Sequence, residues 1–291
     1  MRRGIWLFGA AIALVLVGAL AWQGLSEARR DPIMRSARIV MPQLPTGTAP
    51  IRLALLSDIH IGNGATPPER LDRVVALINA ARPDVVIIAG DSVNGDYRGD
   101  PKFQPDLLVA PLSRLRAPLG VFATMGNHDN TTEPKRVRKA LEDAGITVLA
   151  NSAARAGPLA IAGIDDSTSG FSQVDGTLAA AQAAGGVPVY ATHSPGIYKW
   201  LRNKPITLLL AGHTHCGQAV VRVAGFEFYP TELLYPRNYP KALRCGIGRL
   251  GRQLSVVTGG IGTTSASMRF GAPPDWWLLT LVPSVTKAQV R

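Results

Sequence analysis

The sequence predicts an α/β domain that follows an N-terminal membrane-spanning helix. From residue 51 onward, short apolar runs alternate with amphipathic stretches, which is typical of α/β domains. Between Arg3 and Glu27 there is no charged residue. The chain of 291 residues is 46% hydrophobic and 18% charged, which excludes a disordered chain. Two cysteines exclude a disulfide scaffold and a four-cysteine zinc site.

The N-terminal apolar segment is long enough to cross a bilayer. As a helix, its 23 uncharged residues would span about 34 Å, more than the hydrocarbon core of about 30 Å. We therefore predict a signal-anchor over residues 1–25 that contacts the membrane through residues 5–25. A cleaved secretory signal is the alternative, with Ala19-Leu20-Ala21 as the cleavage site. The length favours the anchor, because a signal peptide's apolar region is usually about 7–15 residues long.

The arginines on the two sides of this segment predict opposite orientations of the span in the membrane. Arg2 and Arg3 favour a cytoplasmic N-terminus, which places the domain on the non-cytoplasmic side of a single-pass protein. Arg29, Arg30 and their neighbours after the span favour the opposite. Four prolines predict a linker over residues 26–50, followed by a domain over 51–283 and a tail over 284–291. From residue 51 the charge is 25 − 18 = +7, so the domain itself is basic.

The apolar runs define the elements in order. We expect strands over 51–56, 85–89, 121–124, 159–164, 187–192, 206–211, 255–258 and 277–281. Helical spacing or composition predicts helices over 69–81, 106–115, 134–144 and 174–184. Residues 218–228 indicate a hairpin that turns near Gly225.

Polar clusters follow five of these strands, and all five histidines of the chain lie in them. The clusters contain Asp58-Ile59-His60, Gly90-Asp91, Gly126-Asn127-His128-Asp129, His193 and Gly212-His213-Thr214-His215. Ligands of open α/β sheets bind outside the carboxyl ends of strands. Carboxylate, amide oxygen and imidazole together suit divalent cations. The candidate metal ligands are therefore Asp58, His60, Asp91, Asn127, His193, His213 and His215, with Asp91 able to bridge two ions.

This ordered set of motifs resembles the calcineurin-like metallophosphoesterase superfamily, over about residues 51–283. Within it, the continuation Cys216-Gly217-Gln218 and the tail from Met268 to Trp276 resemble a membrane-anchored bacterial branch similar to YkuE and YaeI. The resemblance implies a four-layer α/β/β/α sandwich with metals at the carboxyl ends of strands. It also implies location in the bacterial inner (cell) membrane.

The resemblance further implies residue roles and an activity. Two divalent or trivalent ions (Mn, Fe, Zn or Co) would be held, the first by Asp58, His60, Asp91 and His215. The second would be held by Asp91, Asn127, His193 and His213. A hydroxide bridging the ions would attack phosphorus, His128 would act on the leaving group, and Asp129 would orient His128.

The implied substrate is an anionic phosphoester. A phosphodiesterase or pyrophosphatase acting on a phospholipid or a nucleotide-sugar lipid such as UDP-2,3-diacylglucosamine is expected. A nuclease or phosphomonoesterase of the same superfamily is the alternative. The membrane span argues against a nucleic-acid partner, and the sequence indicates no oligomeric state.

Two further features leave alternatives open. Residues 233–274 contain no acid but hold Arg237, Lys241, Arg244, Arg249, Arg252 and Arg269, with Tyr235 and Tyr239 nearby. This segment is either a substrate or lipid-headgroup contact or a variable loop. Cys216 and Cys245 allow at most one disulfide, and we interpret Cys216 as a small packed residue rather than half of a pair.

Overall fold

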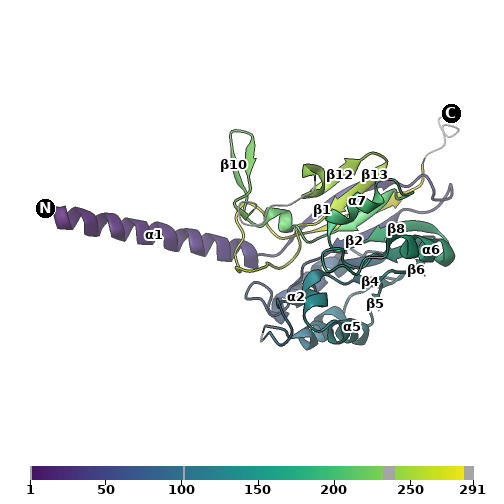
Figure 1. Cartoon of the computed structure of the whole chain (residues 1–291), viewed down its shortest axis with the longest axis horizontal. Coiled ribbons are helices and arrows are strands. Elements are labelled where there is room, and N and C mark those ends of the chain that lie inside the picture. Colours follow the sequence, from purple (N-terminus) through teal and green to yellow (C-terminus); the bar gives the residue numbers. More distant parts are fainter. Residues whose placement is uncertain (1, 101, 232–239, 285–291) are drawn as a thin grey trace.

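The first helix stands clear of the rest of the molecule. The structure, a computed structural model, describes residues 2–100, 102–231 and 240–284. Helix α1 (Arg2–Arg29) projects from the domain as a single rod (Figure 1). Its residues Leu7–Arg29 have a mean hydropathy of 1.9 and are long and apolar enough to cross a membrane. Only its last turns contact the domain, where Gly24 accepts a hydrogen bond from the Arg269 amide.

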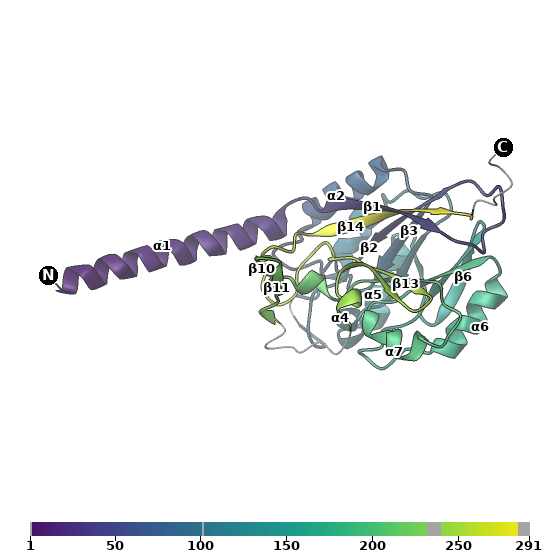
Figure 2. The same cartoon turned by 90° about the horizontal axis from the view of Figure 1, so that it is seen from above.

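The expected linker over residues 26–50 is not an open linker. Residues 33–40 form strand β1 (Ile33–Val40), which pairs in parallel along its whole length with β14 (Asp275–Val282). This difference has a physical reason. Pro32 and Pro42 lie just outside the strand, so they bound it without removing donors from its ladder. The sheet therefore begins almost directly after α1 (Figure 2). The expected tail lies outside the described residues, apart from residue 284.

The first sheet has the strand order β1-β14-β2-β3-β4-β5. Strands β2 (Ile51–Leu56), β3 (Val85–Ala89), β4 (Val121–Thr124) and β5 (Thr147–Val148) run parallel. Strand β14 is antiparallel to β2. Because parallel neighbours end on the same side, the clusters that follow β2, β3 and β4 gather at one edge.

The second sheet has the order β12-β13-β9-β8-β7-β6. Its parallel centre consists of β7 (Leu159–Gly163), β8 (Val187–Ala191), β9 (Leu208–Ala211) and β13 (Gln253–Val257). The antiparallel edges are β6 (Ser152–Ala156) and β12 (Gly246–Leu250).

The domain has four layers of secondary structure, which pack against one another through three hydrophobic cores. Helices α2 (Pro68–Ala80), α3 (Val109–Leu112) and α5 (Pro134–Asp143) pack on the outer face of the first sheet. The two sheets pack against each other through side chains such as Leu55 and Leu210. Helices α6 (Val174–Ala184) and α7 (Tyr198–Leu201) cover the second sheet.

Successive residues of β3 show how the layers form. Val85 and Ile87 face the inter-sheet core, and Val86 and Ile88 face the helices. Alternation along a strand thus buries both faces, which explains the uninterrupted apolar run. The structure is the α/β/β/α sandwich that the resemblance implied. Outside it, β10 (Val221–Val223) and β11 (Phe226–Phe228) form the expected hairpin.

Candidate metal centre

The structure gathers six of the seven residues predicted as metal ligands into two groups, and it places the seventh, Asn127, between Gly126 and His128, whose backbones lie against Asp91. Asp58 and His60 follow β2, and Asp91 follows β3. Asn127 begins α4 (Asn127–Thr131) directly after β4. His193 follows β8, and His213 and His215 follow β9. Both sheets therefore supply side chains to one cluster at their carboxyl ends.

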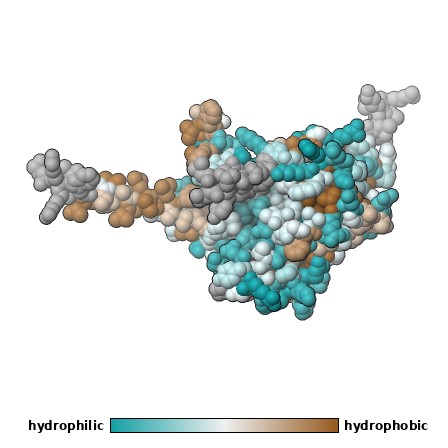
Figure 3. Space-filling view, in the orientation of Figure 1, coloured by the Kyte–Doolittle hydropathy of each residue, from teal (hydrophilic) through white to brown (hydrophobic). Residues whose placement is uncertain are grey.

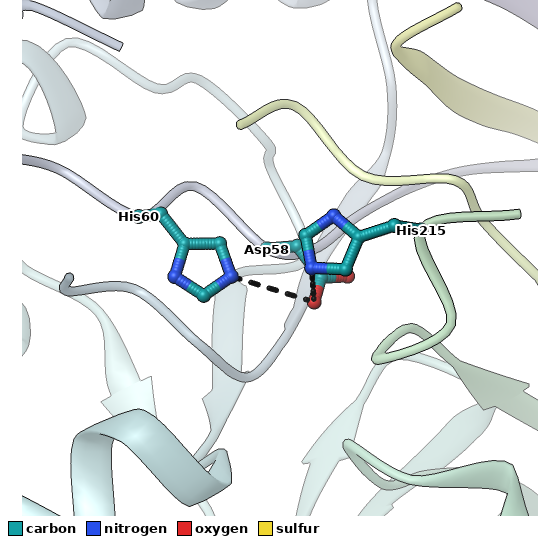
Figure 4. A group of neighbouring side chains, drawn as sticks. All are labelled: Asp58, His60 and His215. Carbon is teal, nitrogen blue, oxygen red and sulfur yellow. Dashed lines mark ion pairs between the residues drawn. The ribbon is translucent and has the colours of Figure 1, made fainter. Parts of the chain in front are cut away.

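One group of donors consists of Asp58, His60 and His215 (Figure 4). Oδ1 of Asp58 lies 3.4 Å from Nε2 of His215 and 3.9 Å from Nε2 of His60. The two imidazole rings are stacked with centroids 5.2 Å apart. All three side chains are buried. Each therefore points a potential metal-binding atom at the same small volume.

A second group consists of Asp91, His193 and His213. Oδ2 of Asp91 lies 3.0 Å from Nε2 of His193. The same oxygen lies 3.7 Å from Nε2 of His60, which belongs to the first group. Nδ1 of His213 lies 3.1 Å from Nε2 of His193. Asp91 thus sits between the two groups, where a bridging ligand would have to be.

The backbone at these positions is in a rare conformation. Five of the seven predicted ligands have positive φ: Asp58 (52°), His60 (48°), Asp91 (52°), His213 (68°) and His215 (49°). For a residue with a Cβ this conformation costs roughly 1–2 kcal/mol. Such strain persists only where the surrounding structure enforces it, and it gathers at functional sites. Here the positive-φ ligands alternate along their loops, at 58 and 60 and at 213 and 215, and their side chains meet in one cluster.

Several buried polar atoms in the cluster have no hydrogen-bond partner within the protein. Both ring nitrogens of His60 and Oδ1 of Asn127 are in this state. A buried, unsatisfied polar atom costs about 1–3 kcal/mol. These atoms belong to the residue types that coordinate divalent cations. The donor set therefore fits metal ions.

Burial also shifts the pKa values of the acids and histidines in this cluster. It raises the pKa of Asp58 to about 6 and lowers the pKa of His60 to about 3. Burial would also raise the pKa of Asp91, but the adjacent His193 holds it well below its usual range. Asp91 in turn outweighs burial and raises the pKa of His193. The region thus stabilises negative charge at Asp91, as a cation site requires.

His128 lies beside the cluster and is partly exposed. Its ring meets that of His60 edge-on, with centroids 4.9 Å apart. Its Nδ1 lies 2.6 Å from the Gly95 carbonyl oxygen and 3.4 Å from Oδ1 of Asp96. Burial alone would lower the pKa of His128, but Asp91 and the bond to Gly95 raise it. His128 is therefore placed to carry a proton next to the metal-binding residues.

Asp129 does not hold the His128 ring, contrary to the role that we expected from the resemblance. Its carboxylate accepts hydrogen bonds from the backbone amides of Ser92 (2.9 Å), Val93 (3.2 Å) and Gly126 (2.9 Å). Burial, then the charge of Asp91, raises the pKa of Asp129 to about 7. Asp129 thus joins the loop after β3 to the loop after β4. The ring of His128 is contacted instead by the Gly95 carbonyl and the Asp96 carboxylate.

Arg269 is a site residue that the sequence did not reveal. We had considered it among basic residues that could contact a headgroup, but it is fully buried. Its guanidinium donates to the carbonyls of Gly259 (2.7 Å) and Ala272 (3.0 Å), and its Nη2 lies 3.3 Å from Nδ1 of His215. It therefore supports the loop that carries His215.

The cysteines form a disulfide, so our interpretation of Cys216 as an unpaired packed residue is wrong. Cys216 pairs with Cys245, with Cα atoms 4.8 Å apart. The disulfide links Cys216, which directly follows His215, to Cys245, which lies 29 positions later and directly precedes β12. Of the basic segment named above, Tyr235, Arg237 and Tyr239 lie outside the described residues.

We predict that Gly126→Ala weakens metal binding. An added Cβ would collide with the carboxylate and amide of Asp91 and displace the shared ligand. Changes beside metal ligands typically cost about 10–100-fold in affinity. The metal content of the purified full chain, measured by mass spectrometry after dialysis, tests this. Gly176→Ala in α6 is the control, because its new Cβ would have no atom closer than 3.8 Å; equal loss in both variants would contradict the account.

Comparison with known proteins agrees with the site. Residues 51–217 match the family model for calcineurin-like phosphoesterases. YkuE of Bacillus subtilis, an uncharacterised metallophosphoesterase, is 30% identical over 82% of this chain and 81% of its own length. The phosphodiesterase YaeI of Escherichia coli is 30% identical over 80% of this chain and 83% of its own. The two bacterial relatives that the resemblance named are thus confirmed.

Animal relatives are longer. A transmembrane protein with a metallophosphoesterase domain from zebrafish (Danio rerio) is 30% identical over 90% of this chain. The chain spans 60% of the length of that protein and 45% of another animal relative. The family model covers more than half of the chain, including every predicted ligand. The chain therefore belongs to the calcineurin-like phosphoesterase family.

Proposed function

We propose that this chain is a membrane-anchored hydrolase of phosphoester or pyrophosphate bonds that depends on two metal ions. The observation that supports it most is the position of Asp91. Its carboxylate lies between one group that contains His60 and another that contains His193. A site for one metal ion would not require two groups of donors that share one carboxylate.

In this proposal, Asp58, His60, Asp91 and His215 hold one ion, and Asp91, Asn127, His193 and His213 hold the other. When bound, such a pair of ions neutralises phosphoryl oxygens and lowers the pKa of a water molecule. Mn, Fe, Zn and Co are the candidates, because the donors are carboxylate oxygen, amide oxygen and imidazole nitrogen.

His128 is the proposed general acid. In the charged ring, or in the neutral tautomer with the proton on Nδ1, the Nδ1–H of His128 donates a hydrogen bond to the Gly95 carbonyl. Asp91 and the bond to Gly95 raise the pKa of His128 above its ordinary value. It can then protonate the leaving oxygen of the ester. Asp129 would act as a positioning residue through the loop backbone.

The proposed substrate is an anionic phosphodiester or pyrophosphate at the membrane, such as a phospholipid or nucleotide-sugar lipid. The exposed apolar α1 and the basic domain support this proposal, as does the phosphodiesterase name of the relative YaeI. A metal-dependent nuclease or phosphomonoesterase of the same superfamily is the second candidate, and the basic charge would fit a nuclease.

A substrate screen on the full chain in detergent tests the proposal. It compares bis-p-nitrophenyl phosphate, p-nitrophenyl phosphate, single-stranded DNA and lipid pyrophosphates, each with added Mn²⁺, Zn²⁺, Fe²⁺ or Co²⁺. We expect the diester or pyrophosphate to be hydrolysed fastest. Absence of hydrolysis with every metal would overturn the enzyme assignment, and preference for DNA would favour the nuclease.

We predict that His128→Ala keeps both metals but loses turnover. Its ring contacts His60, and its nitrogens lie within reach of donor atoms of His60 and Asp91. The group of Asp58, His60 and His215 and the group of Asp91, His193 and His213 nevertheless each have three donors without it. The loss of a general acid typically lowers kcat by about 10²–10⁴-fold. Metal content and kcat are measured on the same preparation. A variant depleted of metal would show that His128 is a ligand instead.

We predict that Asp91→Ala loses both metals, whereas Asp106→Asn loses none. Asp91 serves both groups, and the side chain of Asp106 is 85% exposed on the helical side of the first sheet. The number of ions per chain is measured after dialysis. Retention of two ions by Asp91→Ala would contradict the shared-ligand proposal.

We also propose that the domain lies on the non-cytoplasmic side of the membrane. The Cys216–Cys245 disulfide supports this orientation, since disulfides persist in oxidising compartments and are rare in the cytosol. The orientation agrees with Arg2 and Arg3 preceding the span.

Alkylation of thiols in intact cells measures the side directly. We expect neither cysteine to react until a reductant is added. In the Cys216→Ala control, the exposed Cys245 should react at once, which shows that the reagent reaches it. Immediate alkylation of both cysteines in the unaltered chain would place the domain in the cytoplasm.

A further inference from the structure

The β10–β11 hairpin exposes a compact apolar surface. Its strands pair Val221 with Phe228 and Val223 with Phe226. Paired residues, and residues two apart in a strand, share one face. These four side chains therefore form one face, and they are 48%, 51%, 64% and 81% exposed. We call Val221, Val223, Phe226 and Phe228 the hairpin face.

The opposite side of the hairpin is held by polar contacts to the domain. Arg222 binds Oε1 of Glu227 (3.1 Å) and the Gly271 carbonyl (2.5 Å). Oε2 of Glu227 accepts a hydrogen bond from the Tyr229 hydroxyl (2.7 Å). The bond from Arg222 to Gly271 thus fastens this side of the hairpin to the domain. The hairpin face is what remains turned away from it, and in Figure 3 the hairpin stands out as a brown projection from a largely hydrophilic surface.

The position of the hairpin is fixed relative to the end of α1. Val220 at its base donates to the Phe270 carbonyl (2.7 Å). The same loop binds α1, because the Arg269 amide donates to the Gly24 carbonyl (3.0 Å) and the Gly271 amide to the Glu27 carboxylate (3.3 Å). The ring of Phe270 packs directly on Gly24. Helix end, loop and hairpin base therefore form one continuous unit.

This unit sets the hairpin at the level of the bilayer surface. Glu27 is the first charged residue after the apolar span, so the membrane surface lies near it if α1 crosses the bilayer. Figures 1 and 2 both show the hairpin on the side of the domain from which α1 emerges, extending across the helix axis rather than along it. A ribbon so placed lies along the membrane surface, where amphipathic elements bury an apolar face.

The charged residues beneath the hairpin are also suited to contact a membrane surface. A cavity of about 360 Å³ is lined by Arg35, Arg222, Lys241 and Arg244, with Glu227 as the acid among its lining residues. Arg222 and Lys241 share Glu227 and Arg35 pairs with Asp275, so the cations outnumber the acids that they contact. Cations close to a bilayer are attracted to anionic headgroups. A second copy of this basic chain would bring like charges together, so charge complementarity favours an anionic lipid surface.

We propose that the β10–β11 hairpin is a second membrane contact, with its apolar face among acyl chains and its basic side at anionic headgroups. This inference rests on the proposed membrane anchor but not on the proposed catalysis. The contact would hold the cluster-bearing domain in a fixed pose over the bilayer. The loop at the hairpin base reaches the cluster, because Arg269 also supports His215.

Photocrosslinking of the full chain in nanodiscs of phosphatidylcholine and phosphatidylglycerol tests the contact. A photoreactive p-benzoylphenylalanine replaces Phe226 in one sample and Phe171 in the control. Phe171 is also exposed (53%) but precedes α6, away from α1. We expect at least about tenfold more lipid adduct at position 226, the factor by which burial of one Phe side chain favours an apolar phase. Equal lipid adducts at both positions, or a crosslink from position 226 to a second chain, would overturn the proposal.

A double variant separates this contact from the other proposals. Phe226→Ser/Phe228→Ser in the full chain should lower hydrolysis of a bilayer-embedded phosphoester about tenfold, with hydrolysis of bis-p-nitrophenyl phosphate unchanged. Equal rates on the embedded substrate would contradict the contact. If the unaltered chain hydrolyses nothing, the proposed function fails while the crosslink still decides the hairpin. If alkaline carbonate releases the unaltered chain from membranes, the anchor itself fails.

Discussion

The structure depends most on the burial of carboxylates and imidazoles at one edge of two sheets. Asp58, Asp91 and Asp129 are buried together with His60, His193 and His215. Removing one ion from water costs several kcal/mol even in real proteins. Two kinds of compensation are visible. Backbone amides donate hydrogen bonds to Asp129, and the unpartnered atoms of His60 and Asn127 are suited to bind cations. The strained φ angles of the ligand loops follow from the same requirement.

The loop from Met268 to Ala272 links this centre to the membrane side of the molecule. Arg269 supports His215 through its side chain and Gly24 of α1 through its amide. The neighbouring Phe270 carbonyl accepts a hydrogen bond from the Val220 amide at the hairpin base, and the Gly271 amide donates to the Glu27 carboxylate. The buried Arg269 satisfies several carbonyls of the preceding glycine-containing loop, and the side chains of Asn63 and Gln218 also bind that loop. Metal centre, anchor and hairpin are therefore held by one short segment.

Local pattern predicted most of this fold, and long-range pairing accounts for what it missed. The parallel strands have apolar runs that end in polar clusters, so β2, β3, β4, β8 and β9 and the ligands after them could be placed. Strand β1 could not, because its partner β14 lies about 240 residues away and its half-exposed pattern is weak. The disulfide depends on whether distant loops bring Cys216 and Cys245 together, which spacing does not tell. The contacts of Asp129 and Arg269 likewise arise only when separate loops meet.

The central claim is that two ions share Asp91. Crystals of the full chain grown with Mn²⁺ and measured by anomalous diffraction test it directly. The account predicts two peaks about 3.5–4 Å apart, one beside His60 and His215 and one beside Asn127 and His193, both in contact with the Asp91 carboxylate. A single peak, or two peaks of which only one contacts Asp91, would contradict it.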